Sequence, residues 1–172
     1  MANTNFIKDY KIRDRGKPSY TYIRAREGRT LKGVPPLKIN TWAIGNRKEK
    51  FLNSLEVITK ETTIVSENCL EACRVFFIKN LNSLTSNENY YLHIRPYCHH
   101  ILRKHKKASG KNADRISMGM RLAFGRPFAR VARIKAGQTI FRFEFRNIKL
   151  VLKFKTCLLK VGAITNFKVA LK

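Results

Sequence analysis

Positive charge dominates this chain, in which 36 Lys and Arg stand against 11 Asp and Glu and give a formal net charge of +25. The excess is uneven. Residues 1–88 carry 16 basic and 9 acidic side chains (+7), whereas residues 89–172 carry 20 basic and 2 acidic ones (+18). A surface of this kind repels itself unless a polyanion neutralises it. The sequence therefore predicts a bound polyanion, with most of the contact made by the second half of the chain.

Nucleic acid is the polyanion that the pattern favours. Basic side chains that neutralise phosphates release counterions, so binding should be tight at low salt and weaken steeply as salt rises. A membrane is disfavoured because the basic residues do not line one face of a long amphipathic helix. Residues 1–10 lack an apolar core of signal-peptide length, and no run approaches the ~18–20 apolar residues of a membrane span. We expect a cytoplasmic protein without a membrane partner, whose four cysteines are thiols.

The first 36 residues show no sustained period of a helix or strand and predict an extended basic arm with interleaved tyrosines. Such an arm gains order on RNA through phosphate pairing and base stacking. The alternative is a tail that makes no specific contacts. The arm residues predicted to bind RNA are Arg13, Arg15, Lys17, Arg24, Arg26, Arg29 and Lys32.

Hydrophobic residues make up 44% of the chain, enough for a core, and predict a single domain over residues 37–172. Alternating apolar residues predict one strand over Leu37–Ile44 and a second over Val57–Val65. A helix follows over residues 67–82, with Ser66 as its N-cap.

Further strands are predicted in the second half. Tyr90–Leu102 is rich in β-branched and aromatic residues, and Pro96 within it indicates a bulge or an edge position. Strands are also predicted over Ala129–Ile134, over Thr139–Arg146, where three phenylalanines share one face, and over Ala163–Leu171.

A second helix is predicted over Asn147–Val161, with Ile148, Leu152 and Leu159 on its apolar side and Gly162 at its end. Two helices against a mixed or antiparallel sheet predict a two-layer α+β fold.

Neither a metal site nor an active site is predicted. Cys69 and Cys73 lie four residues apart on one helix, but Cys98 and its two histidine neighbours do not provide the matching pair of a structural zinc site. Cysteine is also a common buried residue. Asp114 and Glu144 are the only carboxylates after residue 88, and no phosphate-cradling or nucleophile motif is present. We therefore expect no catalytic residues, no metal and no cofactor.

The candidate site is a basic loop at residues 103–113 and the track that follows it. Small residues at 108–110 interrupt the loop, which suits it to a narrow, phosphate-lined space. The alternative is that residues 103–113 are only a solvated surface loop. The arginines of the track suit bidentate phosphate contacts. The residues predicted to bind nucleic acid are Arg103, Lys104, His105, Lys106, Lys107, Lys111, Arg115, Arg121, Arg126, Arg130 and Arg133.

Six stretches in order resemble the L-ten-e family of large-subunit ribosomal proteins of archaea and eukaryotes, the counterpart of bacterial L-sixteen. They are Gly33-Val-Pro35, NCLEACR (68–74), HIRPYCHHILR (93–103), NADR (112–115), GMRLAFGRP (119–127) and ARVARIKAGQ (129–138). The chain departs from the family's usual pattern at Asn112 and Phe128, and after residue 140 it matches only in its implied helix and strand.

This resemblance implies an α/β-hammerhead-like domain, contacts with large-subunit rRNA and neighbouring ribosomal proteins, and a loop directed at the acceptor end of tRNA near the peptidyl-transferase centre. In a eukaryote it also implies late assembly factors as partners. We interpret the chain as a structural constituent of the large ribosomal subunit, not an enzyme. The alternatives are an RNA-processing enzyme, a transient ribosome-assembly factor and a DNA-compaction protein.

Overall fold

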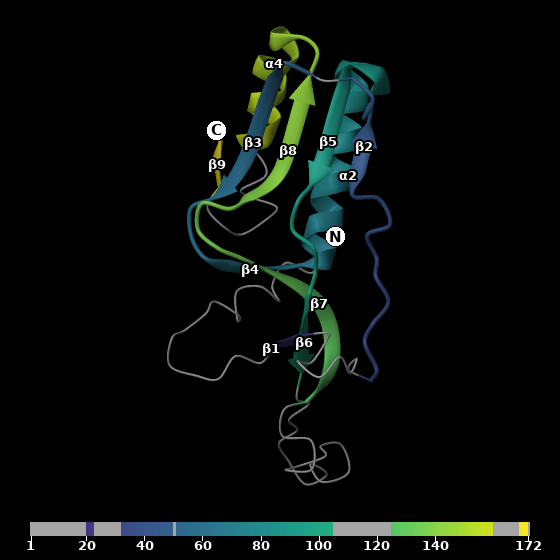
Figure 1. Cartoon of the computed structure of the whole chain (residues 1–172), viewed down its shortest axis with the longest axis vertical. Helices are drawn as coiled ribbons and strands as arrows, with labels where there is room; N and C mark the ends of the chain where they lie inside the picture. Colours follow the sequence, from purple (N-terminus) through teal and green to yellow (C-terminus); the bar gives the residue numbers. More distant parts are fainter. Residues whose placement is uncertain (1–19, 23–31, 50, 105–124, 160–168, 172) are drawn as a thin grey trace, which may run out of the picture.

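A five-stranded antiparallel sheet forms the larger part of the fold (Figure 1). The computed structural model describes residues 20–22, 32–49, 51–104, 125–159 and 169–171. In spatial order, the strands of this sheet are β2 (Ala43–Gly45), β5 (Tyr90–Ile94), β8 (Thr139–Phe145), β3 (Asn53–Thr59) and β9 (Val169–Leu171). Neighbouring strands are all antiparallel.

A second sheet of four antiparallel strands lies below the first in Figure 1. Its order is β1 (Tyr20–Tyr22), β6 (His100–Lys104), β7 (Arg126–Ile134) and β4 (Thr63–Ser66). The single sheet of the prediction is thus two sheets, while the α+β class with two helices and antiparallel pairing is confirmed.

Helix α2 (Glu67–Leu84) begins where the sequence predicts, because the Ser66 hydroxyl accepts a hydrogen bond from the Cys69 N–H at 3.3 Å. A short 3₁₀ helix, η1 (Asn87–Asn89), leads from it into β5. The second helix, α4 (Ile148–Leu159), follows β8 directly. Neither described helix combines the length and apolar character that crossing a bilayer requires.

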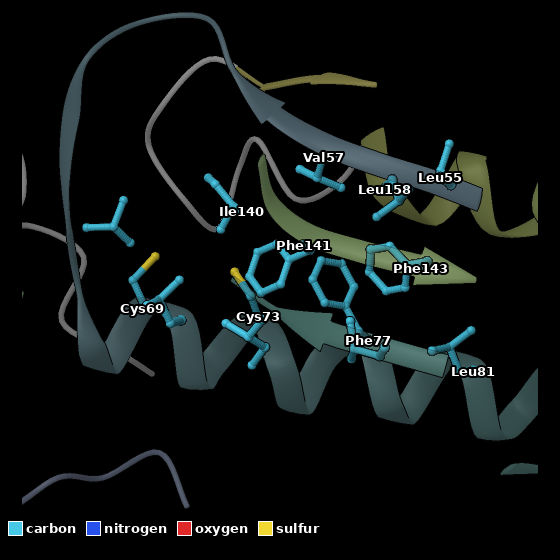
Figure 2. Close-up of a cluster of buried hydrophobic side chains, with 14 of the residues drawn as sticks. Leu55, Val57, Cys69, Cys73, Phe77, Leu81, Ile140, Phe141, Phe143 and Leu158 are labelled. Carbon is cyan, nitrogen blue, oxygen red and sulfur yellow. The ribbon is translucent and has the colours of Figure 1, made fainter. Parts of the chain in front are cut away.

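The core lies between the five-stranded sheet and both helices. The three alternating phenylalanines of β8 are fully buried, as the sequence predicts. Phe77 of α2 meets the rings of Phe141 and Phe143 edge-on, with centroids 4.9 and 5.0 Å away, and Figure 2 shows it pointing from the helix toward β8. Phe154 of α4 packs on Phe143 and Phe145 at 4.8 and 5.7 Å. Both helices therefore cover the same face of the sheet.

The predicted strand Val57–Val65 is wrong as one element, because the chain changes sheets within it. Strand β3 ends at Thr59 and pairs with β8, whereas β4 begins at Thr63 and pairs with β7. The Thr59 hydroxyl donates to the Lys135 carbonyl at 2.9 Å, and the Thr59 carbonyl accepts from the Gly137 N–H at 2.8 Å. These bonds connect the β3–β4 junction to the turn between β7 and β8. The chain changes sheets at that turn too, because β7 belongs to the second sheet and β8 to the first.

The predicted strand Tyr90–Leu102 is likewise two strands. Strand β5 ends at Ile94 in the first sheet and β6 begins at His100 in the second. Pro96 therefore lies in the connection between sheets and is not a bulge within one strand, consistent with its lack of a ladder donor.

Leu37–Ile44 is mostly not a strand, since β2 starts only at Ala43. The N–H groups of Lys38 and Ile39 donate to the Glu67 carboxylate rather than to a neighbouring strand. Ile39 is nevertheless fully buried, which explains the apolar pattern in the sequence.

The apolar face predicted for the second helix is also wrong. Ile148 and Leu152 are each 64% exposed, whereas Phe154 and Leu158 are buried, with Leu150 and Val151 packed beside them. The ring of Phe154 fills the space above the β8 phenylalanines and so sets the rotation of the helix. The side chain of Leu159, like Gly162, lies outside what the structure describes.

Two terminal predictions change in their bounds. Tyr20–Tyr22 of the predicted arm forms β1, which pairs with β6 at the edge of the second sheet. Of the predicted last strand, Val169–Leu171 is present as β9, paired with β3, and the residues before it are outside the described part.

Candidate nucleic-acid interface

The β6–β7 ribbon places basic residues of the predicted site next to each other, and the predicted loop is wrong in its first two residues, because Arg103 and Lys104 belong to β6. Lys104 ends β6 and Arg126 begins β7, and the two residues are register partners. Both are exposed. The ends of the ribbon therefore bring two predicted phosphate-binding side chains together at the point where the chain enters and leaves residues 105–124.

The ribbon contains a β-bulge. Leu102 pairs with Ala129 and Arg103 pairs with Pro127, so β7 has one extra residue, Phe128, at this point of the ladder. Its side chain is 47% exposed, and the Lys104 ammonium lies 5.5 Å from the centre of its ring. From the sequence, Phe128 is a departure from the family's usual pattern and has no predicted functional role. The signal that could have identified it is that it is the single aromatic residue in a basic strand.

Not every predicted arginine is equally available to phosphate. The Arg130 Nε donates to the Pro35 carbonyl at 2.8 Å, so this side chain also fixes the segment before β2. The Arg103 Nε is buried and has no hydrogen-bond partner among the described residues. Arg133 is exposed. Arg103 and Arg130 are thus partly enclosed by the fold, in contrast to Arg126 and Arg133.

The histidine at the start of β6 does not add to this charge. His100 is 2% exposed, and burial, followed by electrostatic interactions with His99 and Arg133, lowers its pKa to about 4. It is therefore neutral at physiological pH. His100 is therefore a buried, neutral residue of β6 and adds no charge to the ribbon.

Carboxylates are distributed differently between the two sheets. The strands β1, β4, β6 and β7 contain no Asp or Glu. In the five-stranded sheet, by contrast, Arg142 of β8 lies 2.9 Å from Glu144 and 3.9 Å from Glu56. The strands of the four-stranded sheet therefore contribute cations without compensating acids, which gives this sheet a net positive charge.

The cysteines form part of the core. Cys69 and Cys73 are buried, and the interaction of the Cys73 thiol with Cys69, together with burial, raises the pKa of Cys73. Burial, with the nearby charge of Glu67, raises the pKa of Cys98 to about 12. Within the described ranges, no three Cys, His, Asp or Glu side chains come together as metal ligands would.

Twelve predicted binding residues lie outside the described part of the chain. They are His105, Lys106, Lys107, Lys111, Arg115 and Arg121 after β6, and Arg13, Arg15, Lys17, Arg24, Arg26 and Arg29 before β2. Lys32 is described and exposed.

Comparison with known families matches residues 17–169 to the family described as ribosomal protein L16p/L10e. The chain belongs to this family. Membership in the L16p/L10e family confirms the resemblance stated from the sequence and makes the protein a structural component of the ribosome, not an enzyme.

Relatives in the L16p/L10e family share much of the chain. One named large ribosomal subunit protein uL16, from Picrophilus torridus, is 43% identical over 123 residues, which are 70% of each chain. The protein of the same name from Methanospirillum hungatei JF-1 is 36% identical over 147 residues, 83% of this chain and 86% of the relative. That from Thermoplasma volcanium is 44% identical over 110 residues, 64% of this chain and 62% of the relative.

Proposed function

We propose that this L16p/L10e protein is a structural constituent of the large ribosomal subunit in the cytoplasm, where the β6–β7 ribbon binds large-subunit rRNA. The observation that carries this proposal is the pairing of Lys104 with Arg126 on a sheet whose strands contain no carboxylate. Such a surface attracts phosphates whatever the RNA sequence is, because phosphate contacts position a protein on RNA without reading its bases.

The loop at residues 103–113 extends this proposal to tRNA. Its first two residues, Arg103 and Lys104, are the end of β6 and pair with β7, so the start of the loop lies on the proposed rRNA-binding ribbon. We place the acceptor end of tRNA near this loop, close to the peptidyl-transferase centre. Peptide-bond formation belongs to RNA in this proposal, and the loop supports tRNA placement and late subunit assembly.

The same proposal covers domain organisation and partners. Residues 1–36 are an arm that lies on rRNA, with Tyr20–Tyr22 docked on β6, and residues 37–172 are one rRNA-binding domain of α/β-hammerhead type. Neighbouring ribosomal proteins are its protein partners, joined in a eukaryote by late assembly factors. The second sheet supports a single domain, because Val65, Ala132 and Ile134 belong to the same core as the five-stranded sheet.

Sucrose-gradient fractionation of cell lysate, at moderate and then at high salt, tests the proposal. Stoichiometric co-migration with large subunits that survives the high-salt wash is the expected result. Substoichiometric protein that the wash removes would instead indicate a transient assembly factor.

A further inference from the structure

Phe128 is a large hydrophobic residue that stays 47% exposed on β7. The other phenylalanines that the structure describes are buried or half-buried, and Phe128 alone among them is exposed. It lies at the bulge of β7, where this strand has one residue more than β6. Bulges redirect a side chain relative to regular strand geometry and are enriched next to functional sites.

The surroundings of the ring are cationic. The Lys104 Nζ lies 5.5 Å from the ring centroid, and Arg126, the register partner of Lys104, is two residues from Phe128 on the same strand. An aromatic ring accompanied by basic side chains is an arrangement with which proteins bind single-stranded nucleic acid, since the ring stacks on a base while the cations contact phosphates.

We propose that Phe128 is a stacking platform for an unpaired nucleobase of RNA. This inference rests on the proposed rRNA-binding function and adds a ligand class to it, a single-stranded or bulged nucleotide rather than a duplex. Bases in an A-form helix are stacked on their neighbours and present no free face, whereas a splayed base does. The Lys104 and Arg126 side chains hold the phosphates adjacent to that base.

Stacking predicts no strong base preference, because every base has a π-face. The proposal also divides the affinity for RNA into a contribution from the cations and a contribution from the ring. The cations determine how affinity depends on salt, and the ring determines the affinity that remains when the phosphate contribution is held constant.

The test measures binding of the full chain to a single-stranded oligoribonucleotide and to a duplex of equal length, over a salt series. Phe128→Ala and Phe128→Leu should weaken binding to the single strand by roughly 5- to 150-fold, with the salt slope unchanged. Phe128→Trp should bind within about twofold of the unchanged chain because its ring also stacks. Duplex binding should be equal in all four proteins.

Fluorescence gives an independent readout. The chain has one Trp, so Phe128→Trp adds a second indole whose emission the single strand should quench more than the duplex does. Tyr97→Ala is the matched control, because Tyr97 is 52% exposed, contacts Trp42 and lies in the connection between β5 and β6 rather than on the β6–β7 ribbon. It should leave RNA affinity unchanged.

The outcomes are distinguishable. Equal single-strand affinity of Phe128→Ala and the unchanged chain overturns the stacking proposal while rRNA binding stands. Retained affinity in Phe128→Leu alone overturns stacking, because a leucine side chain can make only an apolar contact. Salt-independent or absent RNA binding by the unchanged chain overturns the proposed function itself.

Discussion

The carboxylate of Glu67 accepts a hydrogen bond from the backbone N–H of Ile39 at 3.1 Å, across 28 residues of sequence. The same oxygen accepts the neighbouring Lys38 N–H. Glu67 is only 4% exposed, yet it lies in the first turn of α2, where a negative charge is favourable. One buried acid thus anchors the segment before β2 to the start of the helix.

Replacing Glu67 by Ala should lower the free energy of unfolding by about 2–5 kcal/mol, because two backbone donors lose their acceptor. Glu67→Gln keeps an acceptor oxygen and should cost about half as much. The control Glu71→Gln removes a partly exposed acid that pairs with Arg74 on the same helix, and should cost less than about 1 kcal/mol. Urea unfolding in high-salt buffer measures all three. Equal losses at residues 67 and 71 would contradict the anchoring role.

Gly45→Ala should destabilise the fold much more than Gly137→Ala. Gly45 has a φ of 96°, and an added Cβ would meet the Tyr90 carbonyl oxygen at 2.1 Å. Gly137 has a φ of 80° but open space around it. The expected costs are about 2–5 kcal/mol at Gly45, from backbone strain and overpacking together, and about 1–2 kcal/mol at Gly137, from strain alone. Thermal unfolding of the two variants compares them, and a similar loss in both would show that β5 yields to the methyl group.

The rotation of α4 is tested by Phe154→Ala and Leu152→Ala. Phe154 contacts three core rings and its loss should cost about 3–5 kcal/mol. Leu152 is 64% exposed and should change stability by no more than about 0.5 kcal/mol. Chemical denaturation distinguishes the two faces. The reverse order of effects would restore the face predicted from the sequence.

Acid should destabilise the protein in part through His100. Its pKa is near 6.5 in the unfolded chain and about 4 in the fold, so on acidification the unfolded state takes up a proton before the folded state does. The free energy of unfolding should therefore fall as the pH drops from about 6.5 toward about 4. His100→Asn should reduce this slope.

His93 adds to the same slope, because burial, followed by the charges of Arg95, Arg142 and Arg47, lowers its pKa as well. His93→Gln is thus the matched variant, and the double variant should be the least pH-dependent over this range. Denaturant unfolding at several pH values measures the slopes. An unchanged slope in His100→Asn would mean that the pKa of this histidine is the same in the folded and unfolded states.

Neutralising Lys104, Lys106 and Lys107 together as Gln should leave folding intact but impair tRNA placement or subunit maturation, because the loop loses half of its potentially cationic side chains. The matched control changes Lys149, Lys153 and Lys155 to Gln, three exposed lysines on α4 that carry the same total charge. Polysome profiles and growth are the measurements. Normal profiles in the loop variant, or equal defects in both variants, would count against a specific role of the loop.

The sequence by itself determined the features that depend on composition and short-range patterns. The charge excess alone argued against most classes of function, and six ordered motifs pointed to the ribosomal family that the comparison confirms. The Ser66 cap fixed the start of α2, and the alternation of Phe141, Phe143 and Phe145 identified the core face of β8. Capping and strand alternation act over a few residues, so the local sequence is sufficient to predict them.

Only the tertiary structure decided which segments meet. Strand β3 ends at Thr59, whose hydroxyl donates to the carbonyl of Lys135 beside the turn between β7 and β8. The backbone of Ile39 is held by the Glu67 carboxylate rather than by a neighbouring strand. Phe154 sets the buried face of α4 through rings on other elements, and Phe128 is displaced by a register shift against β6. Each outcome depends on a partner remote in sequence, and strand partners and helix rotation follow from packing that no local period encodes.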